Sequence, residues 1–98
     1  MTKVEALARL RDREAELRAL GIERLSIFGS TARGEERSDS DLDLAATLRD
    51  DLRFGVFGFM DLEERVGDLL GGKVDLVREP TYTPRLQAQI DRDRIRVF

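Results

Sequence analysis

Two stretches in the middle of the chain carry residues whose types and spacing could do phosphate chemistry. The first is Gly29-Ser30, which follows the apolar run 25–28. That run is typical of a buried strand, and a glycine after it lets the backbone approach a ligand closely. We expect Ser30 to cap a short helical turn that runs through Arg33 and stops at Gly34. Exposed N–H groups at the start of such a turn bind phosphate.

The second stretch is Asp41-Leu42-Asp43-Leu44, in which carboxylates and leucines alternate. Residues two apart in a strand share a face and lie about 6–7 Å apart, so Asp41 and Asp43 should project from one side. Two carboxylates held this way repel each other, but they bind a divalent cation well. A phosphate cradle followed by an acid pair predicts a site for a nucleoside triphosphate with Mg²⁺. The alternative is a turn and a half-buried strand with solvated acids.

A third carboxylate, Asp75, lies in the apolar segment 74–77. A charge there is unfavourable unless it is paired or bound to metal. If this segment pairs with the strand that begins at Leu42, Asp75 can face the same side as Asp41 and Asp43. Three carboxylates around two Mg²⁺ ions support in-line nucleotidyl transfer, with Asp75 as the general base for the attacking hydroxyl. The alternative for Asp75 is a structural ion pair with an arginine.

The remaining charged residues near these stretches have weaker cases. Arg33 could fork onto a phosphate, although a plain surface arginine is an equal alternative. Asp39 has the same parity as the acid pair but precedes the strand, so we assign it to a turn. Arg37 and Lys73 are expected to be solvated.

Composition narrows the chemistry further. The 98 residues, 41% hydrophobic and 38% charged, predict one soluble globular domain spanning residues 1–98. The chain has neither histidine nor cysteine, so catalysis must rest on carboxylates, hydroxyls, arginines and bound metal. A net charge of −3 gives no support for direct binding of nucleic acid. Because no apolar run can span a bilayer and no signal peptide is visible, we expect no membrane association and a cytoplasmic location.

Hydrophobic periodicity and the positions of capping, glycine and proline residues predict the helices and strands that must position these residues. Helices are expected at residues 3–20, 55–70 and 84 to about 91, and strands at 22–28, 42–47, 74–77 and 94–98, with 48–53 as a connection. The short link between the first two strands favours antiparallel pairing, and the helical crossover between the second and third favours parallel pairing. The predicted fold class is therefore α/β (α+β), a small mixed β-sheet with helices packed on it.

Apolar stripes predict the inward faces of the helices. The third helix should face inward through Leu86 and Ile90. The first helix carries Val4, Leu7, Leu10, Leu17 and Leu20 as its stripe. The second carries Val56, Phe59, Met60, Leu62, Val66, Leu69 and Leu70. Phe54, Phe57 and Phe59 could form a base-stacking platform, but their helical spacing favours the core.

The motif residues resemble a known family. Gly29-Ser30, ten intervening residues and Asp41-Leu42-Asp43 resemble the signature of the DNA-polymerase-β-type nucleotidyltransferase superfamily. Together with Ala32-Arg33-Gly34 and residues 39–44, this motif is similar to that of the superfamily's smallest branch, the minimal nucleotidyltransferases. Those prokaryotic proteins are often paired with a HEPN-domain partner in toxin–antitoxin modules. The segment 72–77 resembles the one that carries the superfamily's third acid.

The residues and the resemblance together give one expected function. The chain should bind ATP or another NTP through Gly29, Ser30 and Arg33. Two Mg²⁺ ions should bind to the carboxylates of Asp41, Asp43 and Asp75. It should move NMP, most simply AMP, onto a hydroxyl. The resemblance implies that this hydroxyl is a tyrosine of a HEPN toxin and that the chain acts as antitoxin.

Three alternatives stay open. The chain could be an antitoxin that neutralises its partner by occlusion alone, with no catalysis. It could be a nucleotidyltransferase for a small molecule such as an antibiotic, or one subunit of an obligate complex. We expect 98 residues to be too few to hold an acceptor-binding domain as well, and we therefore expect a partner or a second copy of the chain to supply the acceptor.

Overall fold

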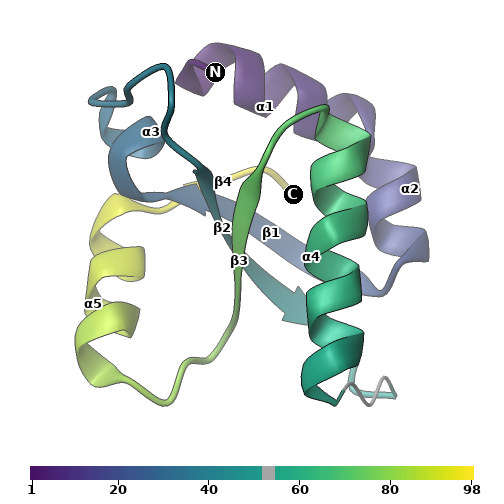
Figure 1. Cartoon of the computed structure of the whole chain (residues 1–98). Coiled ribbons are helices and arrows are strands. Elements are labelled where there is room, and N and C mark those ends of the chain that lie inside the picture. The colour runs from purple at the N-terminus through teal and green to yellow at the C-terminus, as the bar shows by residue number, and fades with distance from the viewer. Residues whose placement is uncertain (52–54) are drawn as a thin grey trace.

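A four-stranded mixed sheet lies at the centre of the protein (Figure 1). The computed structural model describes residues 1–51 and 55–98. The strands are β1 (Ile22–Phe28), β2 (Leu42–Leu48), β3 (Val74–Arg78) and β4 (Ile95–Arg96), in the order β3-β2-β1-β4. β1 pairs antiparallel with β2 and β4, and β2 pairs parallel with β3. The predicted mixed sheet and both predicted pairings are confirmed.

Helices cover both faces of this sheet. They are α1 (Lys3–Asp12), α2 (Glu14–Ala19), α3 (Gly29–Arg33), α4 (Val56–Leu70) and α5 (Pro84–Asp93). The larger core joins α1, α2 and α4 to one face of the sheet, and α5 packs on the opposite face, as Figure 1 shows for α4 and α5. Within the described residues, no helix combines the length and the apolarity that crossing a membrane requires.

The N-terminal helix differs from the single helix predicted over residues 3–20. It is broken at Arg13, whose backbone (φ −105°, ψ 14°) ends α1 before α2 begins. Thr2 and Glu5 form the capping box that starts α1. Val4 is 73% exposed and was wrongly placed in the stripe. Ala6 and Leu10 face the core instead, and a residue two positions before Ala6 points to roughly the opposite side of a helix.

The first turns of α4 carry a second correction. Leu62, Val66 and Leu70 form the buried stripe at four-residue spacing. Phe57 is 85% exposed, so the prediction that it belongs to the core is wrong. It lies five residues before Leu62, which turns it roughly 140° away from that stripe. Val56 and Met60 are also exposed, Phe59 is partly buried against the core, and Phe54 lies outside the described residues.

The smaller core holds α5 on the sheet. Phe28, Ala45 and Ile90 are buried together, with Val77 and Leu86 packed against them. The prediction that Leu86 and Ile90 face inward is confirmed. This helix therefore covers the face of the sheet to which Asp43 and Asp75 belong, because side chains two apart share a face.

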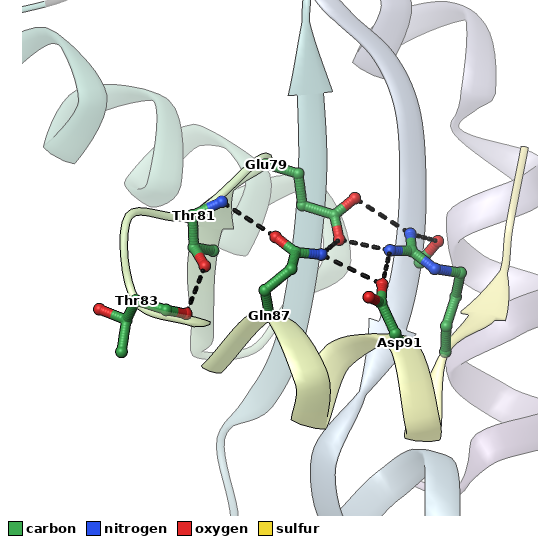
Figure 2. Close-up of polar contacts among 7 residues, drawn as sticks. Glu79, Thr81, Thr83, Gln87 and Asp91 are labelled. Atoms are coloured by element: carbon green, nitrogen blue, oxygen red, sulfur yellow. Dashed lines mark hydrogen bonds and ion pairs between the residues drawn. The ribbon is translucent and has the colours of Figure 1, made fainter. Parts of the chain in front are cut away.

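A polar network fixes both ends of the segment between β3 and α5 (Figure 2). Gln87 accepts from the Thr81 backbone N–H at 2.9 Å and donates to Glu79 and Asp91 at 3.3 and 3.1 Å. Arg94, just after α5, binds Glu79 through both terminal nitrogens and donates to the buried Ser26 hydroxyl at 3.1 Å. The C-terminal end of α5 is thereby joined to β1 and to the chain that leaves β3.

Replacing Arg94 with methionine should lower the free energy of unfolding by about 1–3 kcal/mol, because it strips hydrogen bonds from buried or mostly buried acceptors. The Glu79 side chain is only 11% exposed. Arg65→Met is the matched control, since Arg65 and Asp61 form a pair on the surface of α4 with both side chains about 60% exposed, and such pairs contribute little. Urea unfolding followed by circular dichroism measures both. Equal losses in the two variants would contradict the importance of the network.

Candidate active site

Two of the predicted acids lie side by side on neighbouring strands. Asp43 on β2 and Asp75 on β3 are partners in the parallel register. Their side chains therefore project from the same face of the sheet. Asp43 is half-buried and Asp75 is exposed at the edge strand. Burial raises the pKa of the Asp43 carboxyl above its ordinary value, and the negative charges of Asp75 and Asp41 raise it further.

Asp41 stands apart from this pair. It is exposed and lies just before β2, yet its charge is near enough to affect the pKa of Asp43. In the part of the chain that the structure describes, no group of three histidine, cysteine, aspartate or glutamate side chains is gathered closely enough to hold one metal ion. The structure thus brings Asp43 and Asp75 together, and the role of Asp41 as a metal ligand stays a prediction.

The glycine of the Gly29-Ser30 turn is required by its contact with the acid pair. Gly29 has φ +75°, which side-chain-bearing residues rarely adopt. A Cβ placed there would lie 3.0 Å from Cγ and 3.2 Å from Cβ of Asp43, and it would overlap the Oδ2 atom. The turn therefore packs directly against the carboxylate of Asp43.

Ser30 does not cap this turn as predicted. α3 begins at Gly29, its N-cap is Phe28, and no side chain makes a capping hydrogen bond. The N-cap lies two residues earlier than the sequence pattern indicated, which leaves Ser30 inside the first turn of α3. The predicted stop at Gly34 is confirmed, because Gly34 adopts a left-handed conformation (φ 74°) at the C-cap.

A cleft of about 540 Å³ joins these features. Every predicted site residue except Asp41 lines it. The turn and the two strands form one wall, and α5 forms the other. The lining consists of Phe28, Gly29, Ser30, Arg33, Asp43, Asp75, Val77, Leu86, Gln89, Arg92 and Asp93.

The contribution of α5 to the cleft was not predicted. Asp93 accepts a hydrogen bond from Arg33 at 2.7 Å, and Gln89 and Arg92 line the same space. Nothing in local spacing connects Arg33 with a residue 60 positions later. One signal was available, because Asp93 is three residues after the buried Ile90 and residues three apart share a helix face.

Most of the sequence matches that of a known family. Residues 15–98 match the family described as "Polymerase beta, Nucleotidyltransferase". The chain belongs to this nucleotidyltransferase family. A candidate protein adenylyltransferase of Methanocaldococcus jannaschii is 35% identical over 77 residues, covering 78% of this chain and 76% of that protein. Protein adenylyltransferase MntA of Thermococcus cleftensis is 28% identical over 97 residues, covering 99% of this chain and 95% of its own length.

Solved structures share the fold of this nucleotidyltransferase. The structure of a candidate minimal nucleotidyltransferase superposes with a TM-score of 0.76 at 35% identity, covering 97% of this chain and 95% of that one. A chain from the complex of tri-AMPylated Shewanella oneidensis HEPN toxin with MNT antitoxin superposes with a TM-score of 0.68. That chain is 19% identical, with 94% of this chain and 71% of the other covered, and it shows the likeness of fold alone. The chain is thus an enzyme of the nucleotidyltransferase class, related to protein adenylyltransferases such as MntA.

The donor set of this nucleotidyltransferase suits a divalent cation. Carboxylate oxygens are the ligands that Mg²⁺ prefers. Among the causes that act on the pKa of Asp43, only Arg33 lowers it, while burial, Asp75 and Asp41 all raise it. A bound cation would relieve this repulsion. The acid pair therefore fits the metal that the family typically uses.

The other charged residues near the site behave as predicted. Asp39 is exposed and lies in a turn ahead of β2. Arg37 and Lys73 are exposed to solvent. Arg33, for which a surface role was the alternative, lines the cleft.

Proposed function

We propose that this nucleotidyltransferase transfers AMP from ATP onto a tyrosine hydroxyl of a HEPN-domain toxin and acts as its antitoxin. The observation that carries the proposal is the cleft in which the Asp43–Asp75 pair faces the Gly29-Ser30 turn. The names of the relatives, protein adenylyltransferases with MntA among them, supply the reaction class. The likeness of fold to a chain bound to a tri-AMPylated HEPN toxin supplies the kind of acceptor.

The acids have distinct roles in this proposal. Asp41, Asp43 and Asp75 would hold two Mg²⁺ ions, which when bound neutralise the triphosphate and stabilise the leaving group. Asp75 would accept the proton of the attacking hydroxyl, because it is the exposed acid on the edge strand, where an acceptor can approach. The hydroxyl oxygen then bonds to the α-phosphorus, the bond to the bridging oxygen breaks, and pyrophosphate leaves.

The nucleotide would occupy the side of the cleft away from β3, where the acceptor approaches. The backbone at Gly29 and Ser30 would contact its phosphates, and the Arg33 guanidinium would donate to the triphosphate. In this arrangement the carboxylate pair would lie between the triphosphate and the acceptor. The acceptor would then enter from the side of β3, the edge strand.

The test is transfer of radiolabel from α-labelled ATP. The chain is incubated with Mg²⁺ and the product of the neighbouring gene, and the products are separated by gel electrophoresis and mass spectrometry. If the proposal is right, that product is a HEPN-domain protein and carries the label on a tyrosine. A stable complex without label would support neutralisation by occlusion instead, and label on a small hydroxylated compound without any protein partner would support a small-molecule enzyme.

A further inference from the structure

The end of α5 places a nearly buried carboxylate between two arginines that line the cleft. The Asp93 side chain is 5% exposed, and its Oδ2 accepts a hydrogen bond from Arg33 Nη1 at 2.7 Å. Arg92 Nε donates to Oδ1 at 3.0 Å and Arg92 Nη2 donates to Oδ2 at 3.3 Å, so this guanidinium forks onto the carboxylate. The hydrogen bonds from Arg92 and then Arg33 hold the pKa of Asp93 below its ordinary value.

Arg33 has little else to hold it in place. It ends α3, a helix of five residues. Its other partner is Glu35, at 3.0 Å, whose side chain is 66% exposed. An exposed pair of this kind restrains a long side chain only weakly. The shorter contact with Asp93, whose side chain is nearly buried, is the stronger restraint on the direction of the Arg33 guanidinium.

The helix that carries Asp93 is itself anchored. Arg94, the next residue, is bound to Glu79 and to Ser26 of β1. Ile90, one turn earlier, is fully buried against the sheet. Asp93 is therefore a fixed point, set by the tertiary structure, on the wall of the cleft that faces Asp43 and Asp75.

We propose that Asp93 is a positioning residue for the nucleotide, holding the guanidiniums of Arg33 and Arg92 where their remaining N–H groups meet the triphosphate. The inference rests on the proposed function in taking a nucleoside triphosphate as the ligand. Asp93 is the carboxylate that these two guanidiniums share in the lining of the cleft, while the exposed Glu35 is a further partner of Arg33. The hydrogen bonds to Asp93 also restrict the rotamers of both arginines before the nucleotide binds. Less side-chain entropy is therefore lost on binding than with two unrestrained arginines.

Asp93→Asn tests this role because it keeps the shape of the side chain and removes its charge. The Kd of the full chain for a non-hydrolysable ATP analogue with Mg²⁺ is measured by calorimetry, and KM and kcat are measured in the transfer reaction. We expect Kd and the KM for ATP to rise about tenfold, with kcat changed by less than about threefold, since Asp93 touches no reacting atom. In an Arg33→Met background the same substitution should have a clearly smaller effect.

Asp91→Asn is the matched control. Asp91 is on the same helix and also binds an arginine, Arg94, but its side chain is 61% exposed and it does not line the cleft. The Kd and KM of the Asp91→Asn variant should stay within about twofold of the wild-type values. Thermal melts of both variants report on folding separately.

Three outcomes would overturn the proposal. Tighter nucleotide binding by Asp93→Asn would mean that Asp93 competes with the triphosphate. Equal weakening by Asp93→Asn and Asp91→Asn would indicate a general loss of structure. Unchanged Kd and KM would leave Asp93 with no role. Failure of the proposed function looks different, because the wild-type chain would then bind the analogue, with the expected Asp93 effect, and still transfer no AMP to a HEPN protein.

Discussion

Replacing Asp43 with asparagine should abolish nucleotidyl transfer without destabilising the metal-free protein. The substitution removes a charge that the divalent cation needs, and we expect kcat/KM to fall by at least about 10³-fold. The stability of the metal-free protein should not fall. The pKa of Asp43 is raised in the folded state by burial and by its acidic neighbours, so at neutral pH folding disfavours its ionised form. Asparagine removes this unfavourable charge, and the melting temperature in EDTA should be equal or higher.

Two measurements separate this result from simple misfolding. Added Mg²⁺ should raise the melting temperature of the wild-type chain, since a ligand that binds only the folded state stabilises it, and should not raise that of Asp43→Asn. Asp39→Asn is the matched control, because Asp39 is exposed in the turn before β2 and should keep its activity. A fully active Asp43→Asn enzyme would exclude the proposed site.

Gly29→Ala should cause the largest loss of stability of any single substitution discussed for this protein. Alanine would have to adopt φ +75° and its Cβ would lie 3.0 Å from Cγ of Asp43. The left-handed backbone alone costs about 1–2 kcal/mol, and relief of the overlap must move either the turn or the carboxylate. We expect a total loss of about 3 kcal/mol, or about 12–20 °C in melting temperature for a domain of this size. Transfer activity should fall with it, because either movement disturbs the acid pair.

Gly34→Ala provides the matched control for the backbone effect. Gly34 has nearly the same conformation, φ +74°, but a Cβ there would meet no atom within 4 Å. This variant should lose only the stability that the left-handed backbone costs, about 1–2 kcal/mol, and should retain transfer activity. The difference between the two variants isolates the contact with Asp43. Equal losses would show that this contact contributes nothing.

The sequence predicted the elements well where a local signal existed. The alternation of Asp41 and Asp43 with leucines marked β2, and Gly34 marked the end of α3, since each depends only on neighbours in the chain. Local patterns failed at Ser30 and Phe57. Ser30 is not a cap because α3 already begins at Gly29, and Phe57 is exposed because α4 presents the stripe from Leu62 onward.

The sequence by itself determined the donor chemistry of this protein: carboxylates and arginines without histidine or cysteine, a glycine-serine turn, and the mixed order of strands that follows from the lengths of its connections. Only the tertiary structure decided which of those groups meet. Parallel pairing of β2 with β3 set Asp75 beside Asp43, and the packing of α5 through Ile90 brought Asp93 to Arg33. Such contacts depend on strand register and helix placement, which burial fixes across the whole domain and which no short stretch of sequence records.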